Sequence, residues 1–286
     1  MSKNGPANSG HSIFQRLLNQ AKADGDDFQL LMLRYGMERF LYRLSISSYK
    51  EFFILKGASL FLVWLGHNHR VTRDADLLGF GALDLQGIAD VFRSVCGLEC
   101  DADGMKYQAE TVKVIEIREG QKYDGIRVTL VGMLNTARIP LQIDIGFGDA
   151  VTPEPEIVDY PTIFDAPAPK LKAYSRYTLV AEKLEAIVQL GLANSRMKDF
   201  YDIWLVSRIF EFEGTVLQNA LKRTFERRGS EIPADCPFAF TPDFYNDQQK
   251  QMQWNSFIKK AKPETSVEIC IYTHLRKVAS FVKTLI

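Results

Sequence analysis

The sequence lacks several features that would assign it to a special class of protein. No run approaches the roughly 18 consecutive apolar residues of a membrane-spanning helix, and the polar first eleven residues contain no apolar leader core. We therefore expect a cytoplasmic protein that does not enter a membrane. No repeat of fixed period occurs, which excludes a solenoid. The 286 residues suffice for two modest domains or one large domain.

Cysteine is scarce. Of the four cysteines, only Cys96 and Cys100 lie close together in the chain, and no histidine is near them. Without a histidine partner, zinc ligation is disfavoured, and we expect buried free thiols. The lack of a secretion signal also argues against a disulfide framework.

Net charge is absent as well, because 35 basic residues balance 35 acidic ones. A neutral chain does not coat nucleic acid through bulk charge alone. The signs are nevertheless segregated along the sequence. Residues 74–165 carry a net charge of minus ten, whereas residues 1–73 and 248–286 each carry a net charge of plus five. Evenly mixed surface charge would not give this distribution, so an acidic centre lies between basic ends.

The first half of the chain predicts an α+β fold with a mixed sheet. Polar residues 1–11 predict a disordered tail. Apolar spacing then predicts helices at 12–23, 27–46, 58–65 and 85–95 and strands at 52–55, 76–78, 111–119, 125–134 and 139–147. The glycine after the first strand predicts a strand, turn and helix in succession.

A proline-rich segment divides the chain. Five prolines between residues 151 and 172 would interrupt both helix and sheet, so we interpret this segment as a linker. We place a sheet domain at 1–165 and an all-helical C-terminal domain at 166–286. The predicted helices of the second domain are 178–192, 196–211, 214–228, 246–261 and 264–285.

The sharpest local feature is the Asp74-Ala75-Asp76 motif. Residues two apart on a strand point to the same face, so the two carboxylates lie side by side and repel each other unless a cation joins them. Oxygen ligands of this kind suit Mg²⁺, which completes its shell with water and substrate phosphate. The motif therefore indicates nucleotide chemistry, although Asp-x-Asp pairs also occur in turns and on exposed strands.

Asp144 could supply a third carboxylate. It lies in the strand Ile-Pro-Leu-Gln-Ile-Asp-Ile, on the face opposite to Leu141, Ile143 and Ile145. An aspartate in an apolar strand is costly unless it is paired or binds metal. It would complete a two-metal site for phosphoryl transfer. The alternative is an edge-strand aspartate that faces water.

The turn after the first strand could hold phosphate. Gly57 and the start of the following helix offer backbone N–H groups, and Ser59 adds a hydroxyl. Lys56 could contact phosphate as a point charge. A glycine or a lysine at a strand end is also ordinary turn chemistry, so the turn alone assigns no function.

A second cluster of charged residues occurs in the helical half. Lys183 lies beside an apolar stripe, and Lys198, Asp199 and Asp202 share one side of the next helix. These groups could grip a triphosphate. Spacing alone favours the alternative, a pair of solvated helices in which Lys198 and Asp202 form an exposed pair worth a few tenths of a kcal/mol.

Five segments, KGASL, RVTRDAD, QIDIGFGD, AEKLEA and SRMKDFYD, follow one another over roughly residues 50–206. In this order they resemble the AbiEii family of nucleotidyltransferases, the toxins of abortive-infection toxin–antitoxin pairs, to which the mycobacterial MenT toxins also belong. The resemblance implies a nucleotidyltransferase domain of the polymerase-beta type followed by a helical domain.

The resemblance also implies roles for individual residues. Asp74 and Asp76 would bind Mg²⁺ and take part in catalysis with Lys183 and Asp199, and Asp144 lies where such folds carry a third metal-binding carboxylate. The nucleotide would be bound by Lys56, Gly57, Ser59, Thr72, Lys198 and Asp202. Two departures from the family pattern are Ala58, where a second glycine is usual, and Thr72, where serine is usual. The first bears on the phosphate turn, and the second keeps the hydroxyl.

The resemblance also implies a toxin that transfers nucleotides from an NTP to RNA, such as the tRNA acceptor end, and that is paired with a separately encoded antitoxin. Basic segments at 222–228 and 259–277 are available for RNA phosphates, although each could be a solvated helix face. Two alternatives remain open. One is nucleotidyl transfer to a protein or a small molecule, and the other is a non-catalytic nucleotide-binding module.

Overall fold

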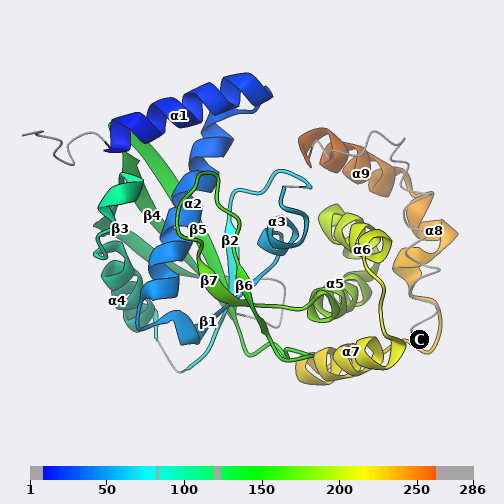
Figure 1. Cartoon of the computed structure of the whole chain (residues 1–286). Coiled ribbons are helices and arrows are strands. Elements are labelled where there is room, and N and C mark those ends of the chain that lie inside the picture. The colour runs from blue at the N-terminus through cyan, green and yellow to red at the C-terminus, as the bar shows by residue number, and fades with distance from the viewer. Residues whose placement is uncertain (1–8, 68, 82–83, 119–123, 262–286) are drawn as a thin grey trace, which may run out of the picture. The chain divides into compact units, whose positions relative to one another are not determined.

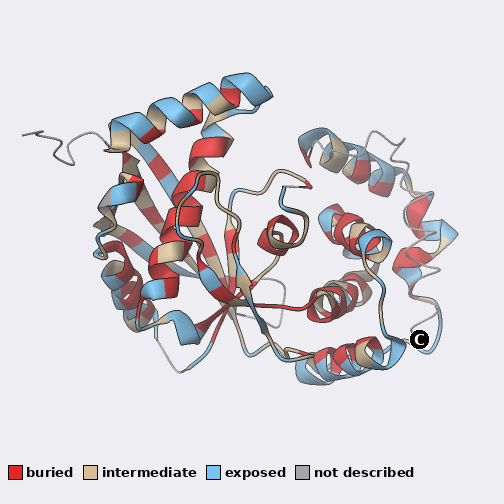
Figure 2. Cartoon of the chain, viewed as in Figure 1, coloured by how far each residue is buried: buried red, intermediate tan, exposed pale blue. Residues whose placement is uncertain are grey.

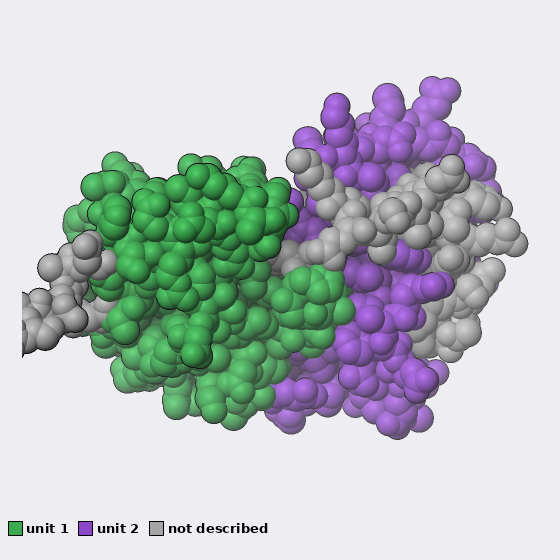
Figure 3. All heavy atoms as spheres, turned by 45° about the horizontal axis from the view of Figure 1, so that its top comes forward, with its two compact units in different colours: residues 1–67, 72–148, 157–173 green, residues 68–71, 149–156, 174–286 purple. Residues whose placement is uncertain are grey.

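The computed structural model describes residues 9–67, 69–81, 84–118 and 124–261. The chain forms two compact units, which Figure 3 colours separately. Unit 1 comprises residues 1–67, 72–148 and 157–173, and unit 2 comprises residues 68–71, 149–156 and 174–286. The predicted domain boundary between residues 165 and 166 falls within the last segment of unit 1.

Up to residue 173 the chain forms helices α1 to α4 and strands β1 to β7, with β3 to β7 in succession (Figure 1). The helices are α1 (Ser9–Asp24), α2 (Phe28–Ile46), α3 (Ser59–Leu65) and α4 (Leu85–Cys96). The strands are β1 (Phe53–Lys56), β2 (Ala75–Gly79), β3 (Met105–Arg118), β4 (Asp124–Leu134), β5 (Ala137–Phe147), β6 (Glu156–Asp159) and β7 (Lys170–Ala173). Short 3-10 turns occupy Lys50–Phe52 and Asp101–Asp103.

The strands form one mixed seven-stranded sheet in the order β3-β4-β5-β2-β1-β7-β6. The pairs β3–β4, β4–β5 and β1–β2 are antiparallel, whereas β2–β5 and β1–β7 are parallel. The predicted mixed sheet is therefore confirmed. Strand β3 starts six residues before the predicted strand at 111. A register shift between Gln108 and Lys113 breaks the alternation there, which hides the first half of the strand from pattern reading.

Helices α2 and α4 pack on one face of the sheet. Phe40 of α2 stacks on Phe92 of α4, and Phe92 meets Phe53 of β1 edge to face. All three side chains are at most 1 % exposed. Gly36 lets α2 approach β5, because an added Cβ would meet the side chain of Ile139. Figure 2 shows α2 buried over most of its length. Ile139, which faces Gly36 of α2, alternates along β5 with Gln142 and Asp144, so the polar side chains described below lie on the opposite face of the sheet.

Two sequence-based expectations in unit 1 are wrong. The proline-rich segment is not a plain linker, because β6 and β7 lie within it and extend the sheet. Its prolines precede or follow the two strands and do not interrupt them, which is how proline is tolerated beside strands. The predicted disordered tail is also too long. Helix α1 begins at Ser9, so residues 9–11 are helical, and residues 1–8 lie outside the described residues.

Between β7 and Ala261 every described element is a helix. These are α5 (Arg176–Leu190), α6 (Met197–Ile209), α7 (Gly214–Arg228), α8 (Pro242–Tyr245) and α9 (Gln248–Ala261), with 3-10 turns at Gly191–Ala193 and Phe238–Phe240. The predicted helix at 264–285 lies outside the described residues, so an all-helical C-terminal domain stays a prediction. Among the helices described, none has the length and apolar character needed to cross a bilayer.

Among the described residues, Cys96, Cys100 and Cys236 form no disulfide, and Cys96 is buried as expected. Cys100 is only half-buried, so the expectation of full burial is wrong for this residue. Burial raises the pKa of the Cys96 thiol to about 12, which keeps it protonated and unreactive.

Candidate active site

The turn after β1 brings the backbone against Asp76. Gly57 has φ +69°, a left-handed conformation that glycine adopts without strain. A Cβ on Gly57 would overlap the Asp76 carboxylate, so only glycine leaves room for that side chain. The structure confirms the predicted strand, turn and helix. The Gly57 turn leaves room for the Asp76 side chain.

We expect Gly57→Ala to lower nucleotidyl-transfer activity at least tenfold, because the added methyl group must displace the Asp76 carboxylate. The positive φ adds a strain of about 1–3 kcal/mol, which thermal unfolding would report as a lower Tm. Gly229→Ala is a matched control, since Gly229 also has positive φ and an added Cβ there meets open space. Equal activity losses in the two variants would contradict a specific role for Gly57.

A row of four charged residues crosses the sheet next to this turn. Lys56 of β1 lies opposite Asp76 of β2. Asp76 lies opposite Asp144 of β5, and Asp144 lies opposite Arg127 of β4. Residues directly opposite one another share a face of the sheet. The strand order therefore brings Asp76 and Asp144 side by side between two cations, although they are far apart in sequence. We call these four residues the charged row.

Asp144 is held by Arg127. The guanidinium donates two hydrogen bonds to the Asp144 carboxylate, at 2.8 Å from Nε and 2.7 Å from Nη2. Asp144 is only 13 % exposed and lies on a strand that is paired on both sides, so an edge-strand aspartate that faces water is excluded. Sequence reasoning missed Arg127. The strand alternation that picked out Asp144 also singles out Arg127, whose neighbours Ile126 and Val128 are buried.

Asp74 lies directly before β2 and is half-buried. The Thr72 hydroxyl donates to the Asp74 carboxylate at 3.0 Å. Threonine therefore keeps the hydroxyl group of the usual serine, and this hydroxyl orients the Asp74 side chain. Asp74 and Asp76 suit Mg²⁺, which needs only one or two carboxylates. Among the described residues, no three acidic, histidine or cysteine side chains converge closely enough to hold a metal ion. Asp144 as a third metal ligand therefore stays a prediction.

Ser59 is buried at the start of α3. Its side chain is 4 % exposed and shares a hydrogen bond with the Tyr160 hydroxyl. Burial raises the pKa of Tyr160 to about 12, so this hydroxyl keeps its proton. Contact between Ser59 and a nucleotide stays a prediction. Lys56 and Gly57 are both half-buried at the end of β1.

Unit 2 contains a separate buried network of charges. Lys183 of α5 donates to Asp199 at 2.7 Å and lies 2.9 Å from Asp202, both on α6. The two aspartates are fully buried, and Lys183 is 12 % exposed. The alternative of two solvated helices is therefore wrong for these three residues. Lys198, predicted to act with them, is exposed.

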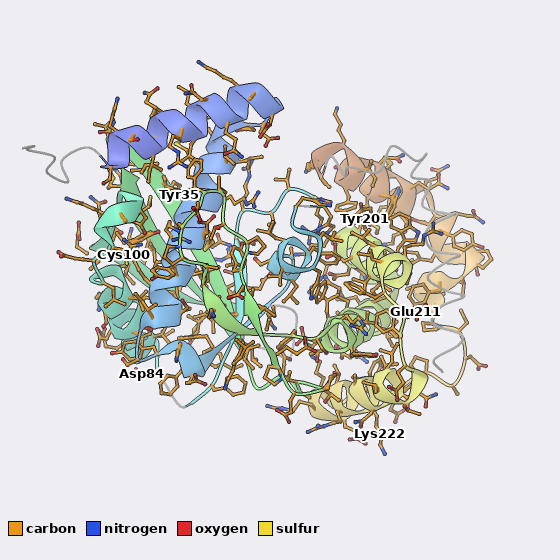
Figure 4. All side chains as sticks on the ribbon, viewed as in Figure 1. Tyr35, Asp84, Cys100, Tyr201, Glu211 and Lys222 are labelled. Atoms are coloured by element: carbon orange, nitrogen blue, oxygen red, sulfur yellow. The ribbon has the colours of Figure 1, made fainter. Side chains whose placement is uncertain are left out.

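Two arginines and a histidine complete this network, and sequence reasoning assigned a role to none of them. Arg70 donates to both carboxylate oxygens of Asp202, at 3.0 Å each. His69 Nε2 lies 3.0 Å from Asp202, and Arg196 donates to Asp199 at 2.6 Å. The His69 ring stacks on Tyr201 of α6, which Figure 4 labels. Arg70 begins the RVTRDAD segment, His69 directly precedes that segment, and Arg196 directly precedes α6. Proximity to the predicted motifs was therefore the available signal.

Burial and mutual attraction compete within the network. Burial disfavours the charged state of Lys183, Asp199 and Asp202, but for these three groups the attraction between opposite charges prevails. It raises the pKa of Lys183, which faces Asp199 and Asp202. It lowers the pKa of Asp199 and holds the pKa of Asp202 well below its usual range, where Arg70 and Lys183 act together. All three groups are therefore charged at neutral pH.

His69 makes unit 2 sensitive to mild acid. Burial lowers its pKa, against the opposing pull of Asp202, so the folded chain binds fewer protons than the unfolded chain below about pH 6.5. The neutral form of His69 therefore favours the folded state above about pH 6.5, and this stabilisation is lost as the pH falls below that value. We expect the free energy of unfolding to decline by at most about 1.4 kcal/mol per pH unit from this group. In His69→Gln, the decline should be shallower when urea unfolding is compared at pH 7.5 and pH 5.5. Identical slopes would contradict the assignment.

Comparison with solved structures shows the fold. The chain is similar to JHP933 from Helicobacter pylori, with 15 % identity, a TM-score of 0.54, and coverage of 91 % of this chain and 94 % of that one. It is also similar to a candidate nucleotidyltransferase of H. pylori, with 15 % identity, a TM-score of 0.52, and coverage of 91 % and 97 %. None of the curated proteins compared with the chain matches it.

A family comparison confirms the resemblance noted in the sequence. The model of the AbiEii nucleotidyl transferase toxin of Type IV toxin–antitoxin systems matches residues 39–274, and this range includes the charged row and the unit 2 network. Because the match covers well over half of the sequence, the chain belongs to the AbiEii nucleotidyl transferase toxin family.

Proposed function

We propose that the chain is a Mg²⁺-dependent nucleotidyltransferase toxin that adds nucleotides from an NTP to RNA, at the tRNA acceptor end, and so blocks translation. The observation that carries this proposal is the strand register that aligns Asp76 with Asp144 beside the Gly57 turn. Two carboxylates beside a backbone turn are suited to a divalent cation and a phosphate chain.

Asp74 and Asp76 would hold the metal. When bound, Mg²⁺ neutralises charge on the triphosphate and favours attack by a hydroxyl group. The chain itself supplies the surroundings. Lys56 lies next to Asp76 in the charged row and places a positive charge at the turn, and Thr72 fixes the orientation of Asp74. Arg127 fixes the orientation of the Asp144 carboxylate by donating two hydrogen bonds to it.

The reaction balances as a single displacement. The acceptor hydroxyl oxygen forms a bond to the α-phosphorus of the NTP. The bond between that phosphorus and the oxygen that bridges to the β-phosphate breaks, and pyrophosphate leaves. The hydroxyl proton passes to water. No oxidant or reductant is needed.

Exposed cations in unit 2 support an RNA acceptor. Lys222, Arg223 and Arg227 are exposed on α7, and Lys259 and Lys260 are exposed on α9; Figure 4 labels Lys222. Lys222 has only a weak partner, since its Nζ lies 3.9 Å from a carboxylate oxygen of Glu226. Such groups bind RNA phosphates in a salt-dependent manner. This argument favours a polyanionic acceptor over a small molecule.

The direct test is incubation of the purified chain with labelled NTPs, Mg²⁺ and total tRNA. We expect label in tRNA with the wild type and none with Asp74→Ala. If no label is transferred to tRNA with any of the four NTPs, the proposal is overturned. Transfer that survives RNase treatment would favour a protein or small-molecule acceptor, and NTP binding without turnover would favour a non-catalytic module.

Membership in a Type IV toxin–antitoxin family implies an antitoxin partner. We propose that it is encoded next to this chain. Expression of the chain alone should slow growth in a manner that requires Asp76, and co-expression of the neighbouring reading frame should restore it. Growth that is unaffected by the wild-type chain would contradict a toxin.

A further inference from the structure

A pocket of about 800 Å³ opens beside the charged row, entirely within unit 1. It lies along the first half of β5. Strand β2 pairs with β5 only from Ile143 onward, so residues 137–142 are paired with β4 but extend past the start of β2. Leu30 and Leu33 of α2 and Leu141 contribute apolar surface to the pocket. Its volume falls within the range of about 300–1,000 Å³ that is typical of small-molecule sites.

Three exposed cations line this pocket: Arg73, Lys113 and Arg138. Two acids also line it, but Asp27 is occupied as the N-cap of α2, where it accepts hydrogen bonds from two backbone N–H groups. Glu110 is the other acid. The positive side chains therefore outnumber the acids, which suits a ligand with negative charge.

The pocket is continuous with the catalytic face of the sheet. On neighbouring strands β3, β4 and β5, the side chains opposite one another are Lys113, Thr129 and Gln142. Thr129 and Gln142 lie two residues along their strands from the charged-row residues Arg127 and Asp144, and therefore on the same face of the sheet. The Gln142 side chain lies beside the pair of Arg127 and Asp144, with its amide oxygen placed to accept from Nε and Nη2 of Arg127 at 3.2 Å. Arg73 directly precedes Asp74 in the chain. The lining includes Leu141, which faces α2, and Gln142, which lies on the face of the charged row, so the pocket takes in both faces at the part of β5 that extends past β2. A ligand on the α2 side would therefore reach the carboxylates by passing round this edge.

The pocket and the Gly57 turn lie on opposite sides of the carboxylates. In the strand order, Lys56 and Gly57 follow β1 on one side of β2, whereas the pocket lies on β5, β4 and β3 on the other. Displacement at phosphorus requires the attacking and leaving oxygens to be roughly in line. If the phosphates occupy the turn, the attacking hydroxyl enters from the pocket side.

We propose that this pocket binds the 3′-terminal nucleotides of the acceptor, a single-stranded RNA end, and that Arg73, Lys113 and Arg138 contact its phosphates. The inference rests on the proposed nucleotidyl transfer. The leucine side chains offer apolar surface to a base, and Thr129 and Gln142 offer hydrogen bonds to a ribose. An acceptor protein would have to insert an acidic segment into the same space. The binding and transfer experiments below distinguish an RNA acceptor from a protein acceptor.

The binding test uses a short 5′-fluorescein-labelled single-stranded RNA and measures anisotropy over a range of salt concentrations. Lys113→Glu and Arg138→Glu should each weaken binding about tenfold. Lys113→Ala and Arg138→Ala should each lower the salt dependence, log Kd against log salt, by about 0.7, as expected for loss of one phosphate contact. Lys50→Glu is the matched control, because Lys50 is exposed in unit 1 and does not line the pocket. Equal binding by the pocket variants and the control would overturn the inference.

Transfer kinetics separate this inference from the proposed function. The pocket variants should raise the KM for tRNA about tenfold and leave the KM for the NTP unchanged. If the wild type transfers nucleotide and the pocket variants match Lys50→Glu, the pocket inference fails and the function stands. If the wild type transfers no nucleotide, yet binds RNA through Lys113 and Arg138, the proposed function fails and the pocket inference stands. Transfer to a protein that depends on these residues would overturn the RNA assignment.

Discussion

Asp76→Asn is expected to reduce nucleotide transfer by about 10³-fold. Loss of one charged group that stabilises a transferring phosphoryl group costs about 4 kcal/mol of transition-state stabilisation. Asp76 contributes more than charge, because Gly57 and the register with Asp144 fix its position. The amide has nearly the same shape as the carboxylate, so the change removes charge and leaves the packing beside Gly57 intact.

The rate of label incorporation into tRNA measures this effect, and thermal unfolding reports whether the fold survives. We expect the Tm to stay close to that of the wild type, because the substitution relieves repulsion between Asp76 and Asp144. Asp90→Asn is the matched control, since Asp90 is an exposed acid on α4 in the same unit. A variant at position 76 that kept a tenth of the wild-type rate would rule out a catalytic role for this carboxylate.

Asp202→Ala is expected to destabilise the chain by about 3–5 kcal/mol. Removal of one partner from a buried charge network leaves the remaining charges without compensation, and that penalty is large. In unit 2 the groups left behind are Lys183 and the guanidinium of Arg70, both of which the Asp202 carboxylate contacts. His69 loses its carboxylate partner at the same time.

Urea unfolding, followed by far-UV circular dichroism, measures this loss. Lys198→Ala serves as the control on the same helix, because Lys198 is exposed, and a surface substitution of this kind changes stability by about 0.5 kcal/mol at most. Similar unfolding midpoints for the two variants would show that the network contributes little. A Lys183→Met variant that stays folded at low temperature then separates a structural role from a catalytic one. If transfer by that folded variant equals that of the wild type, Lys183 is not catalytic.

The sequence predicted most of the local structure around the charged row. Alternation identified Asp144 on the polar face of its strand, and glycine after a short apolar run marked the Gly57 turn. The pairing of strands could not be read in this way. Register depends on contacts between residues far apart in the chain, so neither the alignment of Asp76 with Asp144 nor the arginine opposite them followed from spacing.

Burial of the helical charges was also beyond pattern reading. Asp199 and Asp202 lie on a helix with apolar residues on several sides, and spacing alone favoured a solvated face for these charges. Their burial depends on cations from other segments, of which Arg70 comes from before β2. The strands β6 and β7 were hidden for a related reason. Their prolines indicated a linker, and only the formed sheet shows that the residues between the prolines can pair.

The interleaved course of the chain sets an order for assembly during synthesis. His69 and Arg70 belong to unit 2, but Asp202 follows His69 by 133 residues. On the ribosome His69 and Arg70 emerge long before the carboxylate that pairs with them. The sheet can be completed once β7 has emerged, whereas residues 68–71 must wait for α6. Since domains fold as they leave the ribosome, unit 2 closes last, and a nascent chain stalled before residue 202 carries a finished charged row beside an unfinished second unit.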